Sequence, residues 1–199
     1  MKTKFFYMLL FLLVFNIGCT TAGSKFIQIN YIGLQQTPNN QKIGISPFLD
    51  KREIKEKKFI GKRILNSGNE EIYFVNGAGL DQTITQNFES YFHKTGYQIE
   101  KIDPWEPSIE KLKTLNKTLK YVISGEIKEF EFFAVKDFKT TMTLDIKLII
   151  YIGDLEKNII KTVPANLSLK RTDLNFSKER VEMFMSESIT EIILKSFDF

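Results

Sequence analysis

The sequence predicts an α+β fold in which two amphipathic helices pack on one face of a mostly antiparallel sheet. Residues 142–152 alternate apolar and polar side chains, and this period of two suits a strand with one buried face. Residues 163–169 alternate in the same way after a polar turn, so the two segments predict an antiparallel hairpin. Apolar residues recur at helical spacing in 80–94 and in 181–197, which predicts the two helices.

Short segments rich in apolar and β-branched residues predict three strands in the first half of the chain, at 26–32, 43–48 and 70–76. The helix of 80–94 follows and ends before Gly96, a residue type that commonly terminates helices. A further strand is expected over 96–102. After Trp105, a polar helix is expected over 108–117.

The strand that follows the polar helix carries two conflicting alternations. Ile123 and Ile127 share one face of an extended chain, whereas Phe130 and Phe132 fall on the opposite face. A β-bulge within 125–129 would direct both sets toward the core, because one extra residue reverses the alternation.

The closing helix has a clear start. Ser177 is a typical N-cap residue, and Glu179 lies in the first turn, where the helix dipole favours an acid. The apolar stripe that follows is expected to cover the sheet: Val181, Phe184, Met185, Ile189, Ile192, Ile193 and Phe197.

The first residues have the layout of a secretory signal. Two lysines precede an uninterrupted apolar run over 5–15, and Gly18 supplies a small residue before Cys19. Eleven residues span roughly 16 Å as a helix, about half of a hydrocarbon core, so a permanent transmembrane anchor is not expected. We therefore expect residues 1–18 to be a signal peptide that is removed.

Cys19 is the only cysteine in the chain. One interpretation is an incidental thiol, although exported proteins generally use cysteines in disulfide pairs. The other interpretation is lipidation, because Ile17-Gly18-Cys19 resembles the lipobox of bacterial lipoproteins, with Asn16 in place of the usual leucine-like residue. A lipid on the sulfur would explain the missing disulfide partner and would hold the protein on a membrane. Residues 19–25 are then the lipidated tether, and 26–199 form one domain.

The charge balance argues against nucleic-acid binding. The chain has 28 basic and 24 acidic residues, and removal of Lys2 and Lys4 with the signal leaves a net charge of only +2. Basic residues gather in 50–63, DKREIKEKKFIGKR. One interpretation of this segment is a solvated loop or strand edge. The other is contact with acidic lipid headgroups or with an acidic partner.

The sequence contains no recognisable catalytic or metal-binding motif, so we expect no enzyme activity, no cofactor and no metal. The single histidine, His93, is expected to be an exposed residue near a helix end. Glu129 and Glu131 could act as an acid–base pair, but two acids at strand spacing beside lysines are typical of a solvated face.

Three aromatic residues are candidates for binding a partner. Trp105 lies between two prolines, where a rigid exposed tryptophan can anchor a partner, and the alternative is a lid over the core. Phe130 and Phe132, in EFEFFAV, are either core residues or an exposed aromatic strip at a sheet edge.

Residues 42–197 resemble the YajG-type bacterial envelope lipoproteins and related auxiliary outer-membrane lipoproteins. The resemblance rests on the order of the elements and on IGISPFLDKR, FHKTGYQI and YVISGEIKEF, with Pro47-Phe48 and Gly96-Tyr97 as residue matches. It implies an envelope location and an accessory role, and it supplies no catalytic residues.

Together these features predict a lipid-anchored, non-enzymatic envelope lipoprotein that binds an envelope protein through its sheet edge or helix-free face. Thr20 follows Cys19 where an aspartate retains some lipoproteins in the inner membrane, so the outer membrane is expected. The main alternative is a lipid-binding auxiliary component of an envelope transport system, and a surface adhesin is the third.

Overall fold

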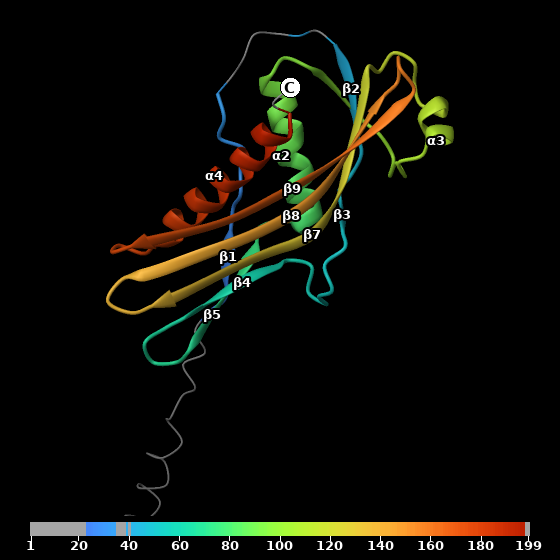
Figure 1. Cartoon of the computed structure of the whole chain (residues 1–199). Helices are drawn as coiled ribbons and strands as arrows, with labels where there is room; N and C mark the ends of the chain where they lie inside the picture. The colour runs from blue at the N-terminus through green and yellow to red at the C-terminus, as the bar shows by residue number, and fades with distance from the viewer. Residues whose placement is uncertain (1–22, 35–38, 40, 198–199) are drawn as a thin grey trace, which may run out of the picture.

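A computed structural model describes residues 23–34, 39 and 41–197. These residues form one nine-stranded sheet that curls into a half-barrel and carries three helices (Figure 1). The strands are β1 (Lys25–Ile27), β2 (Lys42–Ile45), β3 (Leu49–Asp50), β4 (Phe59–Ile64), β5 (Glu70–Val75), β6 (Gln98–Lys101), β7 (Tyr121–Lys136), β8 (Thr140–Asp154) and β9 (Ile159–Asp173). The helices are α2 (Leu80–Lys94), α3 (Ile109–Thr114) and α4 (Lys178–Ser196).

The expectation of a mostly antiparallel sheet with two packed helices is wrong, because the sheet is mixed and there is a third helix. β1 is parallel to β5, β2 is parallel to β6, and β2, β3 and β4 each run parallel to β7. Antiparallel pairing joins β4 to β5, β7 to β8 and β8 to β9. Parallel partners are joined by long crossover connections, so no local turn motif in the sequence marks them.

The long strand β7 organises the sheet. One of its edges pairs with β8 along its whole length, and the other meets β2, β3 and β4 in succession. The predicted bulge is confirmed, because the register of β7 against β8 shifts between Ile127 and Glu129. Ile127 and Phe132 are both fully buried as a result, although they occupy alternation positions of opposite parity.

Several predicted elements are present with adjusted ends. The helix predicted over 80–94 is α2, and Ser177 caps α4 by accepting a hydrogen bond from the Arg180 amide. The polar helix is shorter than predicted and is capped by Ser108. The strands β3 and β4 were not predicted, and β4 lies inside the basic segment 50–63.

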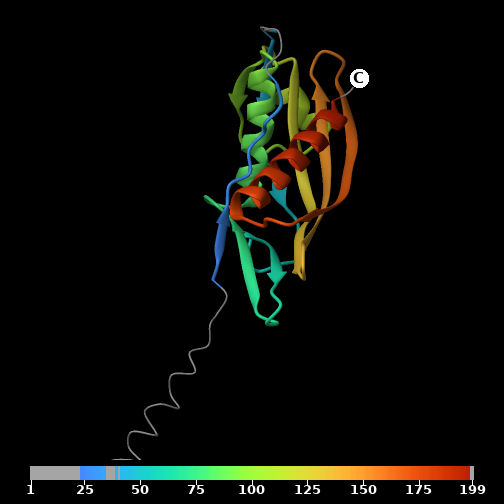
Figure 2. The same ribbon diagram turned by 90° about the vertical axis from the view of Figure 1, so that its left-hand side faces the viewer.

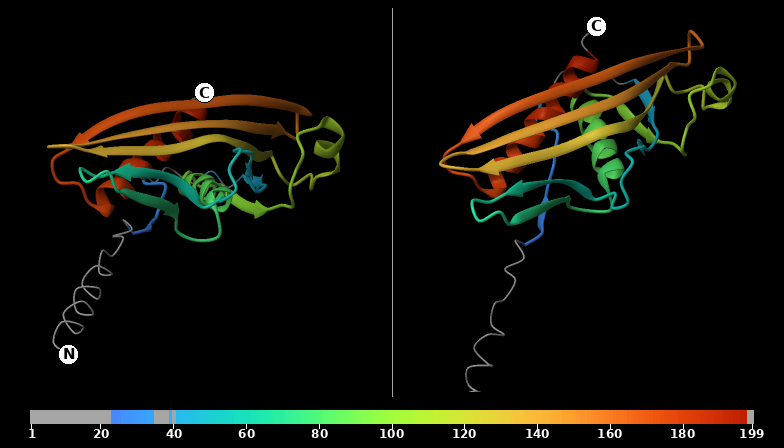
Figure 3. Two further views of the ribbon diagram at one scale, coloured as in Figure 1. Left: turned by 90° about the horizontal axis from the view of Figure 1, so that it is seen from below. Right: turned by 60° about the horizontal axis from the view of Figure 1, so that its bottom comes forward.

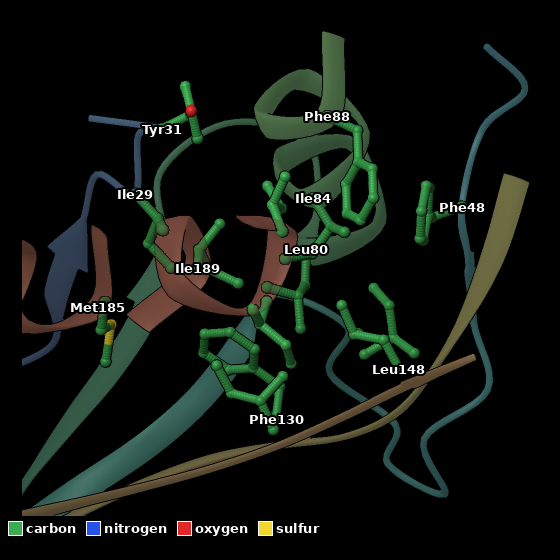
Figure 4. Packing of buried hydrophobic residues seen from close by; sticks show 14 of the residues in the cluster. Ile29, Tyr31, Phe48, Leu80, Ile84, Phe88, Phe130, Leu148, Met185 and Ile189 are labelled. Atoms are coloured by element: carbon green, nitrogen blue, oxygen red, sulfur yellow. The ribbon is translucent and has the colours of Figure 1, made fainter. Parts of the chain in front are cut away.

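α2 and α4 cover the same face of the sheet (Figure 2), and the main hydrophobic core lies between these helices and the strands (Figure 4). The predicted stripe of the closing helix is confirmed, because Val181, Phe184 and Ile189 are at most 1% exposed. Phe48, which follows β2, packs on Phe88 of α2 with ring centroids 4.5 Å apart. α3 lies away from this layer, at one end of the molecule (Figure 1).

Residues 28–33 run between α2 and α4, and side chains of both helices bind their backbone. We call this arrangement the seam. Three alternate amides donate hydrogen bonds of 2.9–3.1 Å to α4: Gln28 to Glu182, Asn30 to Ser186, and Ile32 to Thr190. Three carbonyls accept bonds from α2: Ile29 from Asn87, and Tyr31 and Gly33 from Lys94.

The spacings of the two partners match, because two extended residues span about 6.6 Å along the chain and four helical residues span about 6 Å along the helix axis. Polar side chains at every fourth position of α4 therefore match every second amide of the extended chain. For this reason the strand predicted over 26–32 pairs with another strand only at Lys25–Ile27.

The seam predicts small stability losses. Ser186→Ala or Thr190→Ala leaves one backbone amide without its partner, and each should lower the free energy of unfolding by about 1 kcal/mol. Ser90→Ala is the control, because the Ser90 hydroxyl bonds a carbonyl of its own helix and is exposed. Urea unfolding followed by circular dichroism measures the difference, and equal midpoints for all three variants would show that the seam adds no stability.

Candidate functional site: an aromatic cleft

The residues predicted as sites do not come together. Cys19 lies outside the described residues. Phe130 and Phe132 are buried within the main core. Trp105 is 6% exposed and closes a small separate core with Leu112. In the described structure none of the three aromatic side chains is presented to solvent, and this geometry matches the core alternative for each of them.

The candidate acid–base groups are surface residues. His93 is exposed in the last turn of α2. Glu129 forms an ion pair with Lys147 of β8, and Glu131 is exposed. Among the described residues, no group of three or more histidine, cysteine or acidic side chains is placed to hold a metal ion. In the same part of the chain, no helix is long and apolar enough to cross a membrane.

The basic segment 50–63 is not a uniformly solvated face, because its two arginines are buried. Arg52 forms a two-pronged ion pair with Asp50, with Nη2 at 2.7 Å from Oδ2. Its guanidinium also donates to three backbone carbonyls over 2.8–3.3 Å: those of Lys57, Phe59 and Phe130. Arg63 pairs with Glu71 at 3.1 Å. Arg52 therefore joins the segment between β3 and β4 to the sheet, and Arg63 links β4 to β5.

An apolar cleft of about 420 Å³ opens where α2 and α4 end, beside the first residues of β7 and the turn between β8 and β9. Five aromatic residues form its wall: Tyr91, Phe92, Tyr97, Tyr121 and Phe197. Ile123, Ile152 and Ile159 add aliphatic surface. A cleft of this size lies within the range of roughly 300–1,000 Å³ that is usual for small-ligand sites. We call it the aromatic cleft.

Phe197 lies at the centre of the aromatic wall. Its ring stacks on Tyr91 with centroids 5.4 Å apart, and it meets Phe92 edge-on at 5.0 Å. Phe92 in turn meets Tyr97 edge-on at 5.6 Å. Stacked and edge-on pairs of this kind add stability beyond the area they bury. The wall is therefore held in place by contacts within the protein.

The rim of the cleft is polar. The Asp154 carboxylate accepts a hydrogen bond from the Lys157 amide at 2.9 Å and lies 3.8 Å from the Lys157 ammonium. Lys161 also lines the cleft. An apolar wall with a polar rim suits an acyl chain or an apolar side chain of a partner, because either can bury carbon atoms while its polar end stays at the rim.

The cleft was not identified from the sequence, because its walls come from segments that are far apart in the chain. A partial signal existed in the crowding of Tyr91, Phe92 and Tyr97 around the end of one helix. That stretch carries more aromatic side chains than one amphipathic face requires. Nothing in it shows that Tyr121 and Phe197 complete the wall.

A scan of protein-family models and a search of curated proteins found no match. Solved structures resemble the fold. Protein XCC0632 from Xanthomonas campestris, of family model DUF330, has a TM-score of 0.51 at 8% identity, covering 86% of this chain and 91% of that one. Lipoprotein GNA1162 from Neisseria meningitidis has a TM-score of 0.42 at 10% identity, covering 76% and 97%. The first likeness concerns the fold alone, and the specific resemblance to YajG-type lipoproteins is not confirmed.

Proposed function

We propose that the protein is a lipid-anchored, non-enzymatic lipoprotein of the bacterial envelope, held at the outer membrane, that acts as an accessory module and binds a partner. The observation that carries this proposal is the placement of two features at opposite ends of the fold. The chain enters the sheet from the tether at one end, and the aromatic cleft opens at the other. A module anchored in this way presents its binding surface away from the membrane.

The strand register defines the two ends. β1 joins the sheet through β5 and β4, and β4 pairs with the last residues of β7, up to Val135. The cleft lies at the first residue of β7, Tyr121. β7 has 16 residues, so the two ends are separated by up to about 50 Å. Figure 1 shows the β7–β8 turn far from the β8–β9 turn, which borders the cleft.

Anchoring is supported by the lipobox-like sequence around Cys19 and is tested by Cys19→Ser. The variant lacks the acceptor sulfur, so it should retain residues 1–18 and incorporate no labelled fatty acid. The wild-type chain should be shortened and labelled. Thr20→Ser is the control, because it alters the neighbouring residue and keeps the acceptor. Metabolic labelling and intact-mass measurement give both readouts, and acyl label on Cys19→Ser would contradict the assignment.

The apolar wall of the cleft also favours the second candidate function, a lipid-binding auxiliary component of an envelope transport system. An acyl chain and an apolar protein side chain make the same contacts with Phe92 or Ile152. The two candidates therefore differ in the molecule that occupies the cleft.

A photoreactive amino acid at Ile159 distinguishes the two occupants. Ile159 lines the cleft but is 52% exposed, so replacing it should not disturb the core. We expect a discrete protein adduct in intact cells, whereas an adduct with the mass of a lipid would support the second function. Thr162, exposed on the same strand and absent from the lining of the cleft, is the control position. Equal labelling from both positions, or none from either, would rule out the cleft as the site.

A further inference from the structure

We infer that the end of the fold nearest the tether is a membrane-contact surface, at which Phe138 and Leu174 enter the interface of the bilayer that holds the anchor. This inference rests on the proposed lipidation of Cys19. The surface consists of the β7–β8 turn, residues 137–139, and the start of the β9–α4 connection, residues 174–175. We call it the tether-side tip.

The tether-side tip exposes two large apolar side chains. Phe138 is 86% exposed and Leu174 is 66% exposed. They are neighbours in the fold, because Thr140, which follows the turn, pairs with Asp173, which precedes Leu174. Exposed large apolar groups that lie together mark interaction surfaces more often than scattered single ones.

The turn does not need a phenylalanine for its own geometry. The Asp137 amide donates to the Lys139 carbonyl at 2.9 Å, which closes the turn through the backbone. Phe138 does not have a positive φ, and tight turns are usually built from glycine, asparagine, aspartate or proline. Exposed Lys136 and Lys139 flank the ring. An aromatic ring between lysines suits a membrane interface, where the ring enters the apolar region and the ammonium groups stay among the headgroups.

The register places this tip on the same side as the tether. Lys25 of β1 pairs with Tyr73 of β5. Tyr73 pairs with Gly61 of β4, and Gly61 pairs with Phe132 of β7. Three strand spacings of about 4.8 Å therefore separate Lys25 from Phe132 at the same level of the sheet. β1 is parallel to β5, β5 is antiparallel to β4, and β4 is parallel to β7. β1 therefore runs antiparallel to β7.

The reach of the tether brings the tip to the bilayer. Cys19 lies six residues before Lys25, and Phe138 lies six residues after Phe132. Because β1 and β7 are antiparallel, residues 23–24, which precede β1, and the end of β7 lie on the same side of that common level. A six-residue tether spans at most about 20 Å. The strand from Phe132 to Lys136 already rises about 13 Å before the turn begins. A lipid on Cys19 lies within that reach of Lys25, so the membrane surface can meet the tip. Figure 3 shows the β7–β8 turn at the end of the sheet opposite the β8–β9 turn.

The experiment uses the lipidated full-length protein in vesicles of phosphatidylethanolamine and phosphatidylglycerol. Acylation consumes the sulfur of Cys19, so Phe138→Cys provides the sole free thiol for an environment-sensitive fluorophore. Leu174→Cys is a second site on the tip. Glu156→Cys, in the exposed β8–β9 turn at the opposite end, is the matched control. We expect lipid-borne spin labels to quench the fluorophore at 138 and at 174 and to leave the fluorophore at 156 unchanged.

The outcomes separate this inference from the proposed function. If the wild-type chain carries no acyl group and does not float with the vesicles, the proposed function itself fails. If it is acylated and floats but the fluorophore at 138 behaves like that at 156, the anchor stands and the contact surface is overturned. A fluorophore that is shielded in native envelopes but not quenched in pure vesicles would show that a protein covers the tip, which would also overturn the inference.

Discussion

Gly61→Ala is expected to remove about 4 kcal/mol or more from the free energy of unfolding, a large share of the roughly 5–15 kcal/mol of a typical domain. Gly61 has φ +151°, a backbone conformation that residues with a Cβ rarely adopt. A Cβ at this position would lie 1.8 Å from the carbonyl oxygen of Phe132. That oxygen belongs to the backbone of β7, so it can move only if the β4–β7 pairing opens.

Gly68→Ala is the matched control for this prediction. Gly68 also has a positive φ, +79°, but no atom lies within 4 Å of a Cβ built there. Its substitution should therefore cost only the conformational penalty of roughly 1–2 kcal/mol. Denaturant midpoints of the two variants measure the difference. Similar losses would mean that the effect of Gly61→Ala comes from backbone strain at φ alone, and not from the close contact between β4 and β7.

Arg52→Ala is expected to cost about 3–5 kcal/mol, because it leaves a buried carboxylate without its partner. The side chains of Arg52 and Asp50 are each 5% exposed. The substitution also removes the donors to three carbonyls that the guanidinium joins. Lys62→Ala is the control, because Lys62 and Glu70 form an ion pair whose side chains are 40% and 45% exposed. Exposed pairs contribute about 0–1 kcal/mol, so equal losses would contradict the structural role of Arg52.

The same pair predicts a dependence on pH. Burial by itself would raise the pKa of Asp50, but the hydrogen bonds and charge of Arg52, together with Lys57, lower it below the ordinary value of 3.8. A carboxyl with a depressed folded-state pKa stabilises the fold above its unfolded pKa, and this contribution is lost as the pH falls through the folded pKa.

In Arg52→Ala, burial still raises the pKa of Asp50, but the hydrogen bonds and charge of Arg52 no longer lower it. Asp50 then accepts a proton more readily in the folded chain. The stability difference between wild type and variant should therefore shrink as the pH is lowered from neutral to below about 4. Urea unfolding at several pH values measures it, and a difference that is constant across this range would contradict the assignment to Asp50.

The elements that were predicted correctly depend on local chemistry. Ser177 and the stripe from Val181 onward define α4, because a cap and a helical period are properties of neighbouring residues. The bulge between Ile127 and Glu129 was also predictable, since a change of parity along one strand has few other causes. The hairpin of β8 and β9 follows from two alternating segments joined by a short turn.

The parallel pairings could not be predicted in this way. β4 lies inside a lysine-rich segment, which is not typical of a central strand. Its Gly61 is required because the Phe132 carbonyl of β7 lies close to it, and the sequence alone does not show that these two strands are neighbours. The burial of Arg52 was missed for a related reason. An arginine in a basic run is typical of a solvated face. The buried position becomes favourable because Asp50 pairs with the guanidinium and the fold brings the carbonyls of Phe59 and Phe130 to it.

The sequence by itself determined the signal-like leader, the single thiol at Cys19, the helices and the alternating strands, because each of these depends on residues that are close in the chain. Only the tertiary structure decided the mixed sheet, the aromatic cleft and the position of β1 near the end of β7 that leads to the Phe138 turn. These features arise from contacts between distant segments, such as Phe92 with Phe197 beside the cleft or Gly61 with Phe132 in the sheet. Many pairings of such segments bury similar apolar area, so the choice among them depends on register and close packing, which residue type and spacing do not encode locally.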